Sequence, residues 1–344
     1  MDPVLLLQRM LDIPSLSGEE SALAAFLVET MRSCGFQASI DEAGNAVGIL
    51  GDGPQEIVLL GHMDTVPGVV PVRIEDGKLY GRGSVDAKGP LATFIAAAAT
   101  VGAVAGKRIV VIGATEEETA SSKGARHAAR TFSPSFCVVG EPSGTRAVTL
   151  AYKGRIVFAY EARAGAAHSA SQTDSILEDG VEFWNRIKGW TDAFNAGKKM
   201  FACLDPALRD IRSENDGLEE SVHLRLSIRI PLGLSPDDVR RHVESLIPGP
   251  GRLRFWGADP PYRAEKNNAL VRAFLRAIRD QGLEPSFKVK SGTSDMNVVG
   301  PVWNCPMVAY GPGDSALDHT PNEHLDLAEF GQAIAILSRV LTLL

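Results

Sequence analysis

The sequence predicts an α/β protein whose mostly parallel central sheet is interrupted along the chain by a second, α+β unit. In roughly the first 150 residues, apolar strand-like segments alternate with helical patterns, which is typical of βαβ units. From about Tyr152 to Arg263, longer segments alternate apolar and polar residues, as strands of an antiparallel sheet do. After residue 265 the first pattern resumes. We therefore expect a discontinuous first domain at 1–151 and 265–344 and an inserted domain at 152–264.

The elements of the first domain follow in order. Ser17 with Glu20 predicts a capping box, and the helix after it ends near Gly35. Apolar runs predict strands that each end at candidate ligand residues: 57–60, 108–114 and 136–139. The C-terminal part predicts two further strands and an amphipathic helix: 288–290, 307–310 and 325–343. In the inserted domain, residues 222–230 alternate so strictly that one face of that strand is apolar and the other polar.

Composition restricts the function classes. The length of 344 residues suits about two domains. A formal net charge of −7 argues against nonspecific nucleic-acid binding, which needs a basic surface. The longest apolar tract is too short to span a bilayer, and the N-terminus lacks the basic start of a secretory signal, so we expect a cytoplasmic protein with no membrane contact. The cysteines show no metal-finger spacing and are expected to be free thiols: Cys34, Cys137, Cys203 and Cys305.

His62 and Asp64 form the first candidate site. They lie two residues apart directly after an apolar strand, so in extended geometry both side chains point to the same side. The imidazole can bind a cation while the carboxylate orients it. The alternative is a loop histidine with a polar neighbour.

Asp86 lies in a glycine-rich turn, 81–89, where the backbone can approach an ion closely. One carboxylate can bridge two cations about 3.5–4 Å apart. An ordinary turn is the alternative. A phosphate loop is disfavoured, because no Gly-Lys-Ser/Thr sequence follows.

Further acids and imidazoles follow the later strands. Glu116, Glu117 and Glu118 end the strand at 108–114, where their repulsion would be relieved by a metal, although acidic runs usually form solvated faces. One could be a ligand and its neighbour a general base. Glu141 follows the strand at 136–139. Spacing alone does not choose between His319 and His324 as a late imidazole ligand. His168 is either an ordinary capped loop residue or a donor that reaches the reaction centre from another domain or subunit.

Taken in this order, these motifs resemble the co-catalytic zinc metallohydrolases that include aminoacylase-1, acetylornithine deacetylase, succinyl-diaminopimelate desuccinylase and glutamate carboxypeptidases. The resemblance covers essentially the whole chain. It implies a zinc-dependent exopeptidase-like catalytic domain, with the insertion at 152–264 serving as a lid and dimerisation domain. It also implies two divalent metal ions, zinc or cobalt.

The resemblance also implies roles for single residues. His62, Asp86 and Glu141 would hold one ion, and Asp86, Glu118 and His319 the other, with Asp86 as the bridge. Asp64 would orient His62, and Glu117 would be the general acid/base. His168 would stabilise the oxyanion in the partner subunit's site, which requires a dimer. Arg229 and the segment 291–295 would contact a substrate carboxylate, and within that segment the candidate contacts are Ser291, Gly292 and Thr293.

Within that family, the segments 81–90, 290–297 and 310–315 look most like one branch. Its members release lysine or ornithine from the C-terminal glutamate side chain of a small acidic amino-group carrier protein, in lysine and arginine biosynthesis. Basic lid residues would then face the carrier, and the candidates are Lys198, Lys199, Arg240 and Arg241. The alternatives are a deacylase of small N-acyl amino acids, a dipeptidase, or a metal-free binding or scaffold protein.

Overall fold

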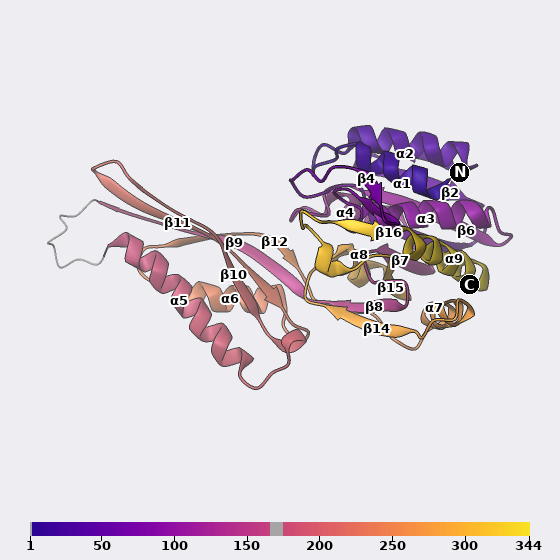
Figure 1. The fold of residues 1–344 in the computed structure, drawn as a ribbon. Helices are drawn as coiled ribbons and strands as arrows, with labels where there is room; N and C mark the ends of the chain where they lie inside the picture. The colour runs from indigo at the N-terminus through magenta and orange to yellow at the C-terminus, as the bar shows by residue number, and fades with distance from the viewer. Residues whose placement is uncertain (1, 166–174) are drawn as a thin grey trace. The chain divides into compact units, whose positions relative to one another are not determined.

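The computed structural model describes residues 2–165 and 175–344. Contacts divide the chain into two compact units (Figure 1). Unit 1 comprises Met1–Ala151, Ala264–Val289 and Ser294–Leu344, and unit 2 comprises Tyr152–Arg263 and Lys290–Thr293. The chain therefore enters unit 2 twice, the second time only for a segment that the sequence had assigned to the first domain.

The main sheet of unit 1 is mixed, with a parallel centre. Its strands lie in the order β1 (Gln37–Ile40), β2 (Ala46–Leu50), β6 (Lys107–Ala114), β3 (Gln55–His62), β7 (Phe136–Gly140), β15 (Met307–Tyr310) and β8 (Ala147–Tyr152), and β14 (Ser286–Lys290) pairs with β8. The four adjacent strands β6, β3, β7 and β15 are parallel, whereas β1, β2 and β8 run antiparallel to their neighbours. The predicted α/β class with a mostly parallel central sheet is confirmed.

The helices of unit 1 bury this sheet. They are α1 (Pro3–Asp12), α2 (Ser21–Ser33), α3 (Lys88–Val101), α4 (Lys123–Thr131), α7 (Ala269–Asp280), α8 (Asp295–Trp303) and α9 (Leu327–Leu343). Helix α3 packs against α1 and α9, α9 also packs against α7, and α4 packs against α8. Ile57, Val58, Leu59 and Leu60 in β3 are all fully buried. Successive side chains in a strand point to opposite faces, so this run shows that both faces of the sheet are covered.

Three of the parallel strands end where the candidate residues begin. Strand β3 ends at His62, β6 is followed by Thr115 and the Glu116–Glu118 run, and β7 is followed by Glu141. Parallel neighbours have their carboxyl ends at the same edge, where open α/β sheets collect ligands. A small antiparallel sheet is formed by β16 (His324–Asp326), β5 (Lys78–Tyr80) and β4 (Arg73–Glu75). The glycine-rich turn with Asp86 follows β5, and His319 lies between the short 3-10 helix η2 (Ser315–Leu317) and β16.

Unit 2 is built on an antiparallel sheet. Its strands lie in the order β10 (Asp205–Asn215), β11 (Glu219–Ile230), β9 (Gly154–Gly165) and β12 (Arg252–Asp259). Helices α5 (Ile176–Asn195) and α6 (Pro236–Ser245) pack on it, and η1 (Met200–Ala202) and β13 (Tyr262–Arg263) complete the unit. The apolar residues of β11 are buried as its alternation predicts: Val222, Leu224, Leu226, Ile228 and Ile230. Phe183 of α5 stacks on Tyr160 of β9 at 4.6 Å between ring centroids.

Two local predictions are wrong at the starts of helices. Helix α2 begins at Ser21, and Ser17 and Glu20 do not form the predicted capping box: Ser17 donates to Asp64, and Glu20 accepts from the backbone N–H groups of Gly18 and Glu116. Helix α9 begins at Leu327 and not at residue 325, since His324–Asp326 pairs with β5 and Asp326 caps the helix by accepting from two backbone N–H groups.

The four cysteines form no disulfide with one another, as their spacing predicts. Cys34, Cys137, Cys203 and Cys305 carry free thiols. Within the described residues, every helix is too short or too polar to cross a lipid bilayer.

Candidate metal centre

Asp86 lies at the centre of the candidate site. Its Oδ1 is 3.3 Å from Nε2 of His62, and its Oδ2 is 3.1 Å from Nε2 of His319. The two oxygens of one carboxylate therefore face two different imidazoles. A carboxylate that bridges two cations presents its oxygens in this way.

Glu118 completes one group of ligands. Its Oε1 is 3.0 Å from Nε2 of His319. Among the described residues, two sets of side chains have ligand atoms within 4.8 Å of one another and could hold a metal ion: Asp86, Glu118 and His319 in one, and His62, Glu117 and Glu118 in the other. The first set is the same as one of the two ligand sets that the family resemblance implies.

Glu141 and His324 are not members of either set of candidate ligands. Glu141 is buried, and its negative charge raises the pKa of the Glu117 carboxyl. His324 stacks on the ring of Tyr80, and its Nδ1 lies 2.7 Å from the carbonyl oxygen of Asn322. Of the two late imidazoles that the sequence left open, His319 is the one that lies with the candidate ligands.

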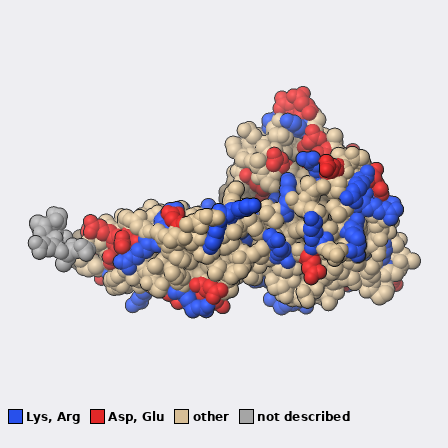
Figure 2. Space-filling view, turned by 90° about the horizontal axis from the view of Figure 1, so that it is seen from below, with Lys and Arg blue, Asp and Glu red and all other residues tan. Residues whose placement is uncertain are grey.

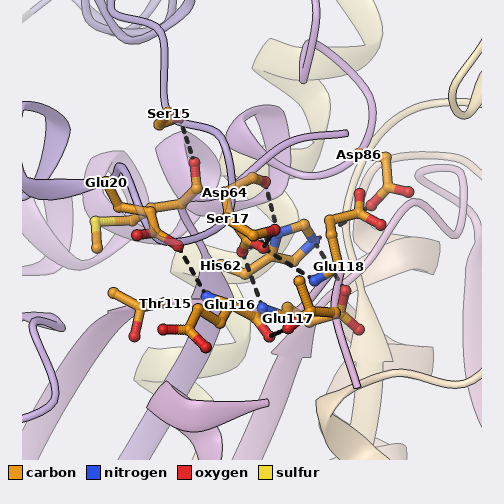
Figure 3. Close-up of polar contacts among 12 residues, drawn as sticks. Ser15, Ser17, Glu20, His62, Asp64, Asp86, Thr115, Glu116, Glu117 and Glu118 are labelled. Carbon is orange, nitrogen blue, oxygen red and sulfur yellow. Dashed lines mark hydrogen bonds and ion pairs between the residues drawn. The ribbon is translucent and has the colours of Figure 1, made fainter. Parts of the chain in front are cut away.

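Asp64 joins the segments that carry His62 and the glutamates (Figure 3). Nδ1 of His62 lies 3.0 Å from the backbone carbonyl oxygen of Asp64 and 3.4 Å from its Oδ1. A proton on Nδ1 donated to Asp64 leaves the Nε2 lone pair directed at Asp86 and available to a cation. The carboxylate of Asp64, fully buried, also accepts hydrogen bonds from the backbone N–H groups of Glu117 and Glu118, each at 3.0 Å.

Ser17 and Glu20, which the sequence assigned to a capping box, form hydrogen bonds with Asp64 and with the turn after β6. The hydroxyl of Ser17 donates to Oδ2 of Asp64 at 2.7 Å. The carboxylate of Glu20 accepts from the backbone N–H of Glu116 at 3.0 Å, and Glu116 has a left-handed φ of 58°. Figure 3 shows Ser17 beside Asp64 and the side chain of Glu20 directed at the turn after β6. The sequence carries no local signal for these roles.

The charges of the site shift its proton affinities. Burial raises the pKa of the Glu117 carboxyl well above its usual range, and the neighbouring negative charges of Glu141 and Asp295 add to the rise against the opposing effect of His62. Hydrogen bonds to Asp86 and Glu118 raise the pKa of His319 to about 10. Negative charge thus accumulates where protonated imidazoles compensate it, and a divalent cation can replace those protons.

Asp295 is placed by the sequence only at the end of a segment expected to contact a substrate carboxylate, with no role beside the candidate base. It is the first residue of α8, and it is buried. Its negative charge contributes to the raised pKa of the Glu117 carboxyl. The only local sign is that Asp295 follows Ser294, which caps α8 and begins the helix.

The predicted substrate-binding residues fall in unit 2. Nη1 of Arg229, on β11, donates to the hydroxyl of Thr293 at 2.6 Å. Ser291 and Gly292 precede Thr293 in the short segment that returns to this unit. His168 lies outside the described residues, so its predicted role stays a prediction.

The site combines imidazole and carboxylate ligands at the carboxyl edge of a mostly parallel sheet with a buried glutamate of raised pKa. This combination is typical of a metal-dependent hydrolase. Comparison with known families agrees with this class. The model of peptidase family M20/M25/M40 matches residues 58–343. The chain belongs to this family, and it is a hydrolase.

Individual relatives indicate which branch of the family the chain resembles. The chain is 49% identical to a [LysW]-lysine hydrolase from Deinococcus radiodurans, over 98% of this chain and 95% of that protein. It is 38% identical to a putative [LysW]-lysine/[LysW]-ornithine hydrolase from Thermococcus kodakarensis, over 97% and 90%. An M20 family metallo-carboxypeptidase from Sulfolobus solfataricus superposes with a TM-score of 0.78 at 18% identity, over 100% and 99%, which shows a shared fold. The family and branch that the motifs predicted are confirmed.

Proposed function

We propose that this protein is a two-metal amide hydrolase that releases lysine or ornithine from the C-terminal glutamate side chain of an amino-group carrier protein. The single observation that carries the metal-dependent part is Asp86, whose two oxygens face His62 and His319. The similarity to the Deinococcus radiodurans protein over nearly the full chain supports the substrate.

The side chains present suit two divalent ions. All the candidate ligands are carboxylate oxygens or imidazole nitrogens, which suit zinc and also cobalt. In the proposed arrangement His62, Asp86 and Glu141 hold one ion, and Asp86, Glu118 and His319 hold the other. When bound, such ions polarise a carbonyl group and lower the pKa of water to about 7.

Glu117 would move the proton. It is buried among other acids, and its raised proton affinity suits a group that accepts a proton from the attacking water and passes it to the leaving amine. Asp64 holds the backbone N–H groups of Glu117 and Glu118. It thereby places the candidate base and the adjoining candidate ligand together.

The residues of unit 2 would contact the substrate. Arg229 and Thr293, which are hydrogen bonded to each other, would bind a carboxylate with help from Ser291 and Gly292. His168 would stabilise the oxyanion in the partner subunit's site, so we also propose a homodimer.

A basic surface would meet the acidic carrier. Arg240 and Arg241 each pair with an acid of their own helix, Glu244 and Asp238 respectively, which reduces the charge they offer to a partner. Lys198 and Lys199 are exposed next to one another and are the stronger candidates. On the face drawn in Figure 2, basic and acidic side chains are interspersed.

The test of the base is the variant Glu117→Gln, with Glu116→Gln as the matched control. Glu116 lies in the same turn, but its carboxylate bonds to Ser121 and lies 3.8 Å from Lys123. We expect Glu117→Gln to retain two metal ions and to lose at least about two decades of turnover, because general acid/base catalysis contributes about 10²–10⁴-fold. Glu116→Gln should stay within a few-fold of the unaltered protein. Near-normal turnover by Glu117→Gln contradicts the assignment.

The substrate is tested separately. Turnover of carrier-linked lysine, carrier-linked ornithine and free N-acetyl-ornithine should be compared in one assay, with metal content measured on the same preparation. The proposal expects the carrier-linked compounds to be preferred. Preference for the free acyl amino acid would favour a small-molecule deacylase, and less than one equivalent of metal without rescue by zinc or cobalt would favour a scaffold protein.

A further inference from the structure

Glu323 is a fully buried carboxylate four residues after His319. Its Oε1 accepts hydrogen bonds from three backbone N–H groups of the glycine-rich turn, those of Gly83 at 3.0 Å, Val85 at 3.0 Å and Asp86 at 3.2 Å. A buried carboxylate is costly unless its oxygens are paired. Here the turn that ends at the candidate bridging residue is wrapped around one oxygen of Glu323.

Arg82 pairs with the other oxygen. Its Nη1 lies 2.6 Å from Oε2 of Glu323, and the arginine side chain is mostly buried. The same guanidinium donates to the carbonyl oxygens of Gly68 at 3.1 Å and Thr320 at 3.4 Å. An arginine is suited to this because its donors are fixed in one plane and reach several acceptors at once.

These contacts connect the turn that carries Asp86 to the turn that carries His319. Glu323 and Thr320 belong to the segment just after His319, while Arg82, Gly83 and Asp86 belong to the glycine-rich turn. The backbone N–H of Gly81 also donates to the carbonyl oxygen of Glu323 at 3.3 Å. The buried pair of Glu323 and Arg82 therefore contacts both of these turns.

We propose that Glu323, neutralised by Arg82, is a positioning residue for Asp86 and for both metal ions. This inference rests on the two-metal site of the proposed function. Glu323 does not itself approach the ligand atoms. It holds the backbone of Asp86 so that the two carboxylate oxygens face the two imidazoles. Because Asp86 is shared, a change at Glu323 weakens the binding of both ions together, whereas loss of a ligand to one ion weakens chiefly that ion.

The first test is Glu323→Gln. A glutamine amide offers one acceptor and one donor group, so it cannot accept from the turn and from Arg82 at the same time. Metal affinity is measured by competition of zinc with a chromophoric chelator, on protein whose fold is checked by circular dichroism. We expect both ions to bind at least about tenfold more weakly, as is typical when the partner of a metal ligand is removed. Activity should recover at saturating zinc.

Glu56→Gln is the matched control. Glu56 also accepts a backbone N–H, that of Ser133 at 3.1 Å, and also pairs with an arginine, Arg108. It lies near the start of β3, at the opposite end of that strand from His62. Its replacement should alter stability and leave zinc affinity within about twofold. Zinc affinity of Glu323→Gln equal to that of this control would overturn the inference.

Arg82 supplies a second, independent test if Glu323→Gln does not fold. Arg82→Lys keeps the positive charge but loses the fork of donors to Gly68 and Thr320. We expect it to weaken both ions in the same direction and to a smaller extent.

The outcomes separate the two proposals. If the unaltered protein fails to bind two ions, the proposed function is wrong and this inference falls with it. If the unaltered protein binds two ions while Glu323→Gln and Arg82→Lys bind them equally well, only the positioning role is refuted.

Discussion

The strongest structural prediction concerns Asp64, because its fully buried carboxylate accepts three hydrogen bonds from two distant segments. Replacing Asp64 by alanine leaves the N–H groups of Glu117 and Glu118 without their acceptor. Each orphaned buried donor costs about 1–3 kcal/mol. With both N–H groups orphaned, we expect the free energy of unfolding of the metal-free protein to fall by about 2–6 kcal/mol.

Ser17→Ala provides the graded comparison. It removes only the 2.7 Å bond from the hydroxyl to Asp64 and leaves the two backbone bonds intact. Its cost should be about 1 kcal/mol, the net value of a typical hydrogen bond. His62 adds a second readout, since Asp64→Ala also removes the carboxylate beside its Nδ1 and should weaken zinc binding by about 10–100-fold.

The assay is urea denaturation of metal-free protein followed by circular dichroism, with the midpoint shift at constant slope giving the change in free energy. A loss below 1 kcal/mol for Asp64→Ala would refute the reasoning, because it would mean that the turn after β6 does not depend on this acceptor. An equal loss for Asp64→Ala and Ser17→Ala would refute it in the same way.

Other consequences can be measured independently. Truncating Phe183, which is fully buried and stacked on Tyr160, to alanine should destabilise unit 2 by about 3–5 kcal/mol in denaturant titrations. Burial raises the pKa of Cys305 to about 11. Because the thiolate is the reactive form, its alkylation followed by mass spectrometry should be slow at pH 8 and accelerate about tenfold per pH unit up to about pH 10; a rate that levels off near pH 9, as for an ordinary thiol, contradicts the shift. Exhaustive chelation should abolish activity and zinc should restore it; a fully active chelated protein contradicts the metal site. Lys198→Glu with Lys199→Glu should raise KM for carrier-linked lysine and leave KM for free N-acetyl-ornithine unchanged; equal changes in both would remove these lysines from the carrier contact.

Much of the fold follows from local patterns in the chain. The apolar runs at 57–60 and 108–114 correspond to the buried parts of β3 and β6, and the alternation at 222–230 corresponds to β11. Strand formation depends on apolar residues placed at regular short intervals, so a sequence shows it directly. The same patterns locate the strand ends, and therefore the edge at which acids and imidazoles collect.

The hydrogen-bond partners of polar side chains, in contrast, do not follow from local patterns. Ser17 and Glu20 have the spacing of a capping box, yet they bond to Asp64 and Glu116, 47 and 96 residues away. His319 and His324 are equivalent by spacing, and only the pairing of β16 with β5 turns His324 away to stack on Tyr80. A hydrogen bond between distant residues depends on which loops come together in the fold, and local patterns in the sequence do not predict that.

The sequence alone thus predicted the class of fold, the positions of its main apolar strands and a list of candidate metal ligands. The tertiary structure alone decided which of them face one another, that both oxygens of Asp86 are directed at imidazoles, and that buried Glu323 holds the turn beneath it. The physical reason is the distance along the chain over which each kind of contact forms. Burial of apolar side chains follows a short repeat along the chain, whereas the pairing of buried charges is set by contacts between segments that are hundreds of residues apart, as for Glu323 and Asp86, separated by 237 positions.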